Sequence, residues 1–156
     1  MKKRYVFWLG SFVLSYIGFF LIENIFTIRP DVISGNGNLG ILVIIGFLPI
    51  FLVSYFFTYK LTREISLNLE NKVKVVLLAI SVICCAFLIL QIVNYIDELI
   101  IALGGSPANP DSRIYRFGWF NQYTNSIFFN AYTFLLTHIV AVVLGFVTSY
   151  RTKLAN

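Results

Sequence analysis

Three carboxylate residues stand near the ends of long apolar segments, where a charged side chain is costly unless it is paired or functional, and three arginines lie in the connections close by. They are Glu23, Arg29, Asp97, Glu98, Arg113 and Arg116. If the apolar segments cross a membrane, the six residues lie near one surface of it. Together they could bind a cation, a lipid headgroup or a basic residue of a partner. The simpler expectation is that acids and arginines pair and close the end of a helix bundle.

Polar residues also occur deeper in the apolar segments. Gln91, Asn94 and Glu98 are spaced i, i+3 and i+7, which places them on one face of a helix. They could line a polar cavity that leads inward from the acids. Hydrogen bonds between helices, worth about 0.6 kcal/mol each in membrane bundles, are the simpler explanation. Asn130, on the last apolar segment, is expected to act in the same way.

His138 is the only histidine and falls near the middle of the last apolar segment. A neutral imidazole there could carry a proton or bind a metal. It stands some ten residues deeper than the acids, however, which is about 15 Å at 1.5 Å per helical residue. Direct proton exchange with them is therefore not expected, and a hydrogen bond to another helix is the preferred interpretation.

Small residues indicate where helices approach closely. Ser11, Ser15 and Gly18 share one face of the first segment. In the second segment, Gly46 and Pro49 make the helix thinner because their side chains are small, and Pro49 should also kink the helix. Close contacts between helices of one chain would use such positions, and so would a homo-oligomer.

The longest polar stretch mixes aromatic residues with arginine, a composition typical of the membrane boundary and of protein interfaces. The candidate residues for contact with a partner are Tyr115, Phe117 and Trp119. Elsewhere, the sequence holds no zinc-binding histidine pair, phosphate-binding glycine loop or serine nucleophile motif. Cys84 and Cys85 lie within an apolar segment and are expected to pack rather than react. No catalytic residue, metal site or cofactor is predicted.

Four apolar segments must position these residues. The chain has 156 residues, of which 58% are hydrophobic and 12% charged, far from the composition of a soluble domain. Each segment is long enough to cross the hydrocarbon layer, which takes roughly 20 residues. The predicted fold is all-α, a single polytopic domain of four antiparallel transmembrane helices at about 5–28, 39–59, 75–103 and 127–150.

The basic residues alternate between the connections of these segments. Nine of the twelve fall at the two ends of the chain or in the second connection: Lys2, Lys3, Arg4, Lys60, Arg63, Lys72, Lys74, Arg151 and Lys153. Because short connections rich in Lys and Arg stay in the cytoplasm, both termini and the loop 60–74 are predicted to be inside. Loops 29–38 and 104–126 then lie outside. With the acids included, the inner side carries +7 and the outer side −2.

These observations favour a non-enzymatic protein of a bacterial cytoplasmic membrane. It would be an accessory subunit or a protection factor that engages a membrane-protein partner, or a second copy of itself, through its outer face. A small oligomeric carrier with an acidic outer vestibule is the alternative, and an interfacial enzyme that uses the outer carboxylates is the third. Lipid is the expected surrounding medium. Nucleic-acid binding is not expected, because the basic residues follow the helix ends and form no folded basic module.

Overall fold

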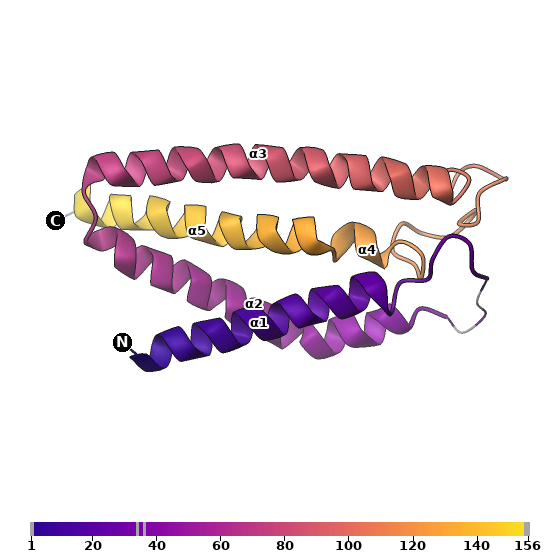
Figure 1. Cartoon of the computed structure of the whole chain (residues 1–156), viewed down its shortest axis with the longest axis horizontal. Helices are drawn as coiled ribbons and strands as arrows, with labels where there is room; N and C mark the ends of the chain where they lie inside the picture. The colour runs from indigo at the N-terminus through magenta and orange to yellow at the C-terminus, as the bar shows by residue number, and fades with distance from the viewer. Residues whose placement is uncertain (1, 34, 36, 155–156) are drawn as a thin grey trace.

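The computed structural model of the chain is all-helical and describes residues 2–33, 35 and 37–154, with side chains described between residues 3 and 150 of these. Its elements are α1 (Lys2–Asn24), α2 (Leu39–Leu67), α3 (Asn71–Ala102), the short α4 (Asn125–Phe128) and α5 (Ala131–Leu154) (Figure 1). The helices α1, α2, α3 and the combined α4–α5 stretch are each long and apolar enough to cross a membrane. The predictions of an all-α chain and of four membrane-length helical segments are therefore confirmed.

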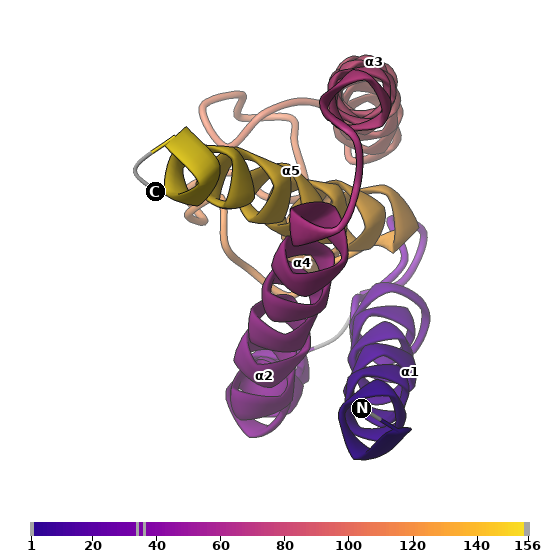
Figure 2. The same ribbon diagram turned by 90° about the vertical axis from the view of Figure 1, so that its left-hand side faces the viewer.

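The helix α5 occupies the centre of the arrangement. It packs against α2 on one side and α3 on the other, while α1 packs mainly on α2 (Figure 2). Both chain ends and the α2–α3 turn lie at one end of the molecule, which we call the terminal end (Figure 1). The two long connections, 25–38 and 103–124, lie at the opposite end, which we call the loop end.

Aromatic side chains fill the space between α1, α2 and α5. Phe19, Ile22, Phe51 and Phe134 form a cluster in which each side chain is almost completely buried. The rings of Phe19 and Phe51 meet edge to face with their centres 4.9 Å apart, an arrangement that aromatic pairs prefer. Outside this cluster most large apolar side chains are exposed, as expected where lipid is the solvent. The exposure is greatest on α3, where only 6% of the most apolar stretch is buried.

Several helix ends differ from the sequence prediction; the third helix, for example, begins at Asn71 rather than near residue 75. The first helix stops at Asn24 rather than near residue 28, and the hydroxyl of Thr27 donates to the carbonyl of Ile22 at 2.7 Å. The second helix continues to Leu67, so the predicted inner loop 60–74 shortens to three residues. Charge alone does not end a helix, since Lys, Arg and Glu are good helix formers.

The fourth apolar segment is interrupted between α4 and α5, where the sequence predicted a continuous helix. Asn130 begins α5 with a reciprocal pair of hydrogen bonds, in which its backbone N–H donates to the Thr133 hydroxyl and its side-chain oxygen accepts from the Thr133 N–H, both at 2.9 Å. Asparagine is favoured at such helix starts because its side chain replaces a missing backbone partner. The interruption turns α4 away from the axis of α5 (Figure 1).

The small residues divide into contact positions and open positions. Ser11, Ser15 and Gly18 are buried, and a Cβ added at Gly18 would lie 2.5 Å from the ring of Phe47, which confirms this face as a contact surface. Gly46 has open space around it instead. The helix α2 is unbroken at Pro49, and its two halves run in different directions (Figure 1).

Candidate functional site at the loop end

The six charged residues predicted to form an outer site do not form one ion-paired group. Glu23 is half-buried, and its carboxylate accepts a hydrogen bond from the backbone N–H of Ala131 at 3.2 Å. This places a negative charge at the start of α5, where the helix dipole favours it. Glu23 therefore has a structural partner that the sequence did not suggest.

Asp97 and Glu98 are exposed on the last turns of α3. Within the described residues, no three side chains of the His, Cys, Asp and Glu types gather closely enough to hold a metal ion. The three carboxylates thus form no joint metal-binding cluster. Since α3 is about 48 Å long and the hydrocarbon layer about 30 Å thick, both acids can reach the headgroup level of a membrane.

The arginines likewise have no partner among these acids in the described part of the chain. Arg29 approaches Asp31, with 3.7 Å between its Nε and the nearer carboxylate oxygen, and both side chains are largely exposed. Such an exposed pair contributes little to stability. Arg113 and Arg116 are exposed on the connection between α3 and α4. The expected closure of the bundle by pairing of these three arginines with Glu23, Asp97 and Glu98 is not observed among the described residues.

The connection that carries Arg113 and Arg116 is folded around its own small core. Leu103, Ile114 and Tyr123 are buried together, with Ile28 and Leu99 packed against them. The hydroxyl of Ser112 donates to the carbonyl of Gly105 at 2.6 Å. This core ties the connection to α3 and to the segment after α1, which gives the outer residues a fixed support.

A second group of hydrogen bonds holds the later part of the connection. The side-chain oxygen of Asn121 accepts from the backbone N–H of Tyr123 at 2.8 Å, and its amide donates to the carbonyl of Gly118 at 2.7 Å. The hydroxyl of Thr124 donates to the carbonyl of Trp119 at 2.7 Å. Side chains of this type organise turns by replacing backbone partners.

Arg116 has the one left-handed backbone conformation among the described non-glycine residues, with φ of 64°. This conformation costs roughly 1–2 kcal/mol for a residue with a Cβ atom. Its N–H donates to the carbonyl of Pro107 at 3.0 Å, and its guanidinium lies 5.0 Å from the ring centre of Tyr115. Glycine would take this conformation without strain. Strain held by a rigid surrounding is a recognised mark of a functional position.

Aromatic side chains are exposed beside Arg116. Phe117, Trp119 and Phe120 are each about half-exposed, although they belong to a segment with a buried core of its own. We call this group the aromatic–arginine surface; it comprises the exposed residues Arg113, Arg116, Phe117, Trp119 and Phe120 and the partly exposed Tyr115. The predicted partner-facing residues Tyr115, Phe117 and Trp119 all belong to it. Trp, Tyr and Arg are the residue types most enriched at the energetic centres of interfaces.

His138 belongs to a separate region, the contact between α2 and α5. Its Nδ1 lies 2.8 Å from the carbonyl oxygen of Phe134, which can only accept, so Nδ1 carries the proton. In the neutral ring Nε2 then accepts from the hydroxyl of Ser54 at 2.9 Å. The rings of Phe12 and Tyr55 meet the imidazole at centre distances of 4.8 and 4.9 Å. Both nitrogens are therefore occupied, and neither is directed at a ligand.

The remaining polar candidates lie on different surfaces. Asn94 is exposed and Gln91 partly exposed on α3, so their stripe is not enclosed by the other helices. Asn130 is buried at the start of α5, where its amide donates to the carbonyl of Ser126 at 2.7 Å. Cys84 and Cys85 are free thiols, partly buried in α3.

Sequence reasoning missed two polar contacts that join α2 to the fourth segment. The side-chain amides of Asn38 and Asn125 exchange two hydrogen bonds, at 2.6 and 3.0 Å. Near the terminal end, the hydroxyls of Ser66 and Ser149 lie 2.5 Å apart. With Ser54–His138 these contacts form a line of polar pairs along α2. The available signal was that Ser54, Ser66 and Ser149 interrupt apolar helices, but it did not identify their partners.

Comparisons of this chain with models of protein families, with curated proteins and with solved structures gave no match.

Proposed function

We propose that this chain is a non-enzymatic accessory or protection subunit of a bacterial cytoplasmic membrane, and that it engages a membrane-protein partner through the aromatic–arginine surface. In this proposal the helices form an antiparallel transmembrane bundle with both termini in the cytoplasm. The loop end then faces outward. The alternation of basic residues along the chain supports this orientation.

The observation that carries the proposal is the conformation of Arg116. An arginine occupies a left-handed position that favours glycine, on a connection with its own buried core, between exposed aromatic side chains. A segment that only links two helices gains nothing from this strain. A segment that presents a guanidinium and aromatic rings to a partner in a fixed geometry does gain from it, because preorganised side chains lose less freedom on binding.

The carrier and enzyme alternatives receive less support from the same residues. Both need the outer carboxylates to act together, whereas Glu23 caps α5 while Asp97 and Glu98 are exposed on α3. The nitrogens of His138 are occupied by Ser54 and by the Phe134 carbonyl.

Site-specific photocrosslinking in living cells tests the proposal. A photoreactive amino acid in place of Trp119 should give one discrete protein adduct, whose identity mass spectrometry determines. The matched control is the same amino acid in place of Ile83, which is 68% exposed in the middle of α3 and should react only with lipid. Lipid adducts alone at both positions would mean that the aromatic residues are a membrane-interface belt, which would contradict the proposal.

Replacement of Arg116 separates binding from folding. Arg116→Gly should remove most of the Trp119 adduct, while the free energy of unfolding stays constant or rises by up to about 1–2 kcal/mol as the strain is relieved. Arg29→Gly is the matched control, because it also replaces an exposed arginine in a connection at the loop end. This variant should keep the Trp119 adduct. If Arg116→Gly retained the full adduct, the strained arginine would have no part in binding.

A further inference from the structure

A lysine that has no counter-ion among the described residues lies near the start of α3, at the terminal end of the molecule. Lys74 is only 3% exposed, and its Nζ has no hydrogen-bond partner among the described residues. The two ion pairs found in the described part of the chain, Arg4–Glu64 and Arg29–Asp31, do not include it. A buried ammonium group without a partner is unfavourable, so this position calls for an anion.

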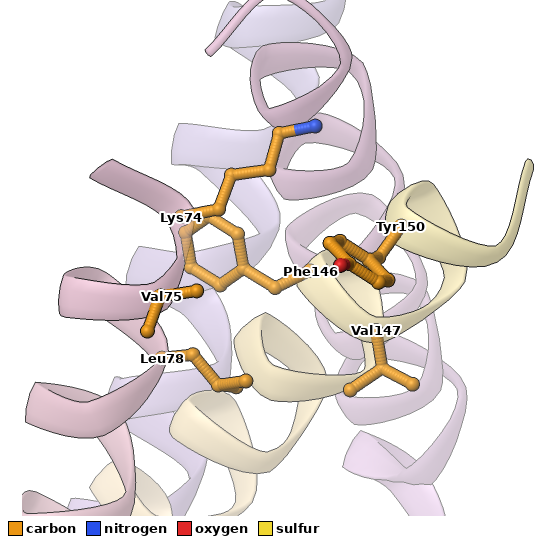
Figure 3. A pocket seen from close by; sticks show the side chains of 6 residues that line it. All are labelled: Lys74, Val75, Leu78, Phe146, Val147 and Tyr150. Carbon is orange, nitrogen blue, oxygen red and sulfur yellow. The ribbon is translucent and has the colours of Figure 1, made fainter. Parts of the chain in front are cut away.

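An apolar groove adjoins this ammonium group between α3 and α5. It has a volume of about 230 Å³ and is lined by Lys74, Val75, Leu78, Phe146, Val147 and Tyr150 (Figure 3). The Lys74 side chain extends away from Val75 and Leu78, so that its nitrogen lies at the opposite end of the lining from these aliphatic groups. The groove therefore combines an almost wholly apolar lining with a buried ammonium group beside it. This is the pattern of a lipid and not of a fully polar ligand.

The surroundings specify the sign of the headgroup. The terminal end carries nine basic residues and two acidic ones, Glu64 and Glu70. Glu64 already pairs with Arg4, while Glu70 is exposed and forms no ion pair with Lys74 in the described structure. Basic positions between membrane helices attract anionic headgroups.

We propose that this groove binds one anionic phospholipid, with the headgroup phosphate at the Nζ of Lys74 and an acyl chain against Val75, Leu78 and Val147. The flexible four-carbon stem lets the ammonium group turn toward the phosphate as the lipid enters. The bound lipid fills the α3–α5 contact at the end where α3 leaves the turn after α2. The site depends on membrane insertion but not on a partner at the loop end.

Native mass spectrometry of the full chain in mild detergent tests the site. Titration with phosphatidylglycerol should give one tightly bound lipid, with an apparent affinity about fivefold or more above that for phosphatidylcholine of the same acyl chains. Lys74→Met should reduce this ratio to about one. Because the substitution removes an unpaired buried charge, the lipid-free variant should unfold at the same or a higher temperature than the wild type, so loss of binding is separable from loss of folding.

Lys72→Met is the matched control, since Lys72 is exposed two residues earlier on the same helix. It should keep the preference for phosphatidylglycerol. An equal loss in both variants would mean diffuse attraction to the basic end, and equal binding of the two lipids by the wild type would mean that no headgroup is recognised. Either result overturns the proposal. The proposal is also overturned if inorganic phosphate alone stabilises the wild-type protein against unfolding as much as phosphatidylglycerol does. Lys74 would then bind a free anion and not a lipid.

The acyl part of the site has its own test. Leu78→Trp should fill the groove and weaken phosphatidylglycerol and phosphatidylcholine alike, without changing their ratio. Unchanged binding of both lipids in this variant would place the acyl chain elsewhere and refute the assigned groove. None of these measurements uses the Trp119 adduct, so failure here leaves the proposed partner surface untouched, and the reverse also holds.

Discussion

The pair Ser54–His138 shows how a polar residue can be accommodated inside an apolar bundle. Each imidazole nitrogen has one partner, and aromatic rings cover the remaining surface of the ring. A polar group left unsatisfied in hydrocarbon would cost several kcal/mol, so both hydrogen bonds are needed to keep the side chain in place. The pair accounts for His138 without a ligand or a proton pathway.

A double-mutant cycle measures this contact. Ser54→Ala and His138→Ala should each lower the free energy of unfolding, and the double variant should lose about 0.6 kcal/mol less than the sum of the two, because the shared hydrogen bond is counted once. Reversible unfolding in mixed detergent micelles provides the values. Strict additivity would mean that the hydrogen bond contributes nothing. Thr148→Ala with His138→Ala, distant on α5, serves as the additive reference.

The sequence could anticipate that His138 would contact another helix, but it could not name Ser54 as the partner. The reason is physical: a helix that is apolar on nearly all sides carries no clear signal of which face is inside. The rotation of α2 and α5 about their axes fixes the pairing, and this rotation comes from packing of large side chains such as Phe51 and Phe134. The same limit explains why Asn38–Asn125 and Ser66–Ser149 were missed.

At the scale of elements, the helices α2 and α5 approach each other closely at Gly145. Among the described glycines, this is the one where an added Cβ atom would come nearest to the backbone of another segment. A Cβ added at Gly145 would lie 2.9 Å from the carbonyl oxygen of Tyr59 and 3.1 Å from the backbone nitrogen of Arg63. Backbone atoms cannot move aside as a side chain does. The two helices would have to separate, which would also disturb the nearby Ser66–Ser149 pair.

Gly145→Ala should therefore destabilise the fold by about 1–3 kcal/mol, the typical cost of overpacking. Gly46→Ala is the control, because Gly46 has open space and lies inside a helix, where alanine is favoured over glycine by about 0.5–1 kcal/mol. Thermal unfolding in detergent should move in opposite directions for the two variants. A stabilised Gly145→Ala variant would show that the helices do not approach as closely as described.

Helix boundaries were the weaker part of the sequence-based prediction. The apolar length of each segment predicted four helices long enough to cross a membrane, and these helices are present. It did not predict the continuation of α2 beyond residue 59, because charged residues can extend a helix past its apolar stretch. It also gave no sign of the interruption at Asn130, which depends on the local competition between side-chain and backbone partners.

At the scale of the whole molecule, the alternation of charge predicts an orientation that the fold leaves open to test. The chain ends and the α2–α3 turn share one end, which carries most of the basic residues (Figure 1). The loop end carries the folded connection and the aromatic–arginine surface. Composition indicated which residues are unusual but not how they are arranged, and the hydrogen bond of Glu23 to the start of α5 required three-dimensional contacts between distant segments.

Cysteine accessibility tests the orientation. In a background with Cys84→Ala and Cys85→Ala, single replacements Ala108→Cys and Asn68→Cys place a thiol at an exposed position of the loop end and of the terminal end, respectively. A membrane-impermeant maleimide added to spheroplasts should label position 108 alone. Lysed membranes should be labelled at both positions, which controls for reactivity. The opposite pattern in spheroplasts would place the termini outside and remove the basis of the proposed outer surface.

The peripheral position of α3 has a consequence for how the chain is made. The main packing partner of α3 is α5, which is synthesised after it. If the helices enter a membrane in chain order, α1 and α2 can associate as soon as both are inserted, whereas α3 stays in contact with lipid until the last segment arrives. The most apolar stretch of α3 has a mean hydropathy of 2.9, the highest of the four, which suits a helix that has no protein partner during this time. The order of the helices along the chain therefore favours one order of assembly. The α1–α2 pair forms first, α5 then packs against α2, and α3 joins last through its contact with α5.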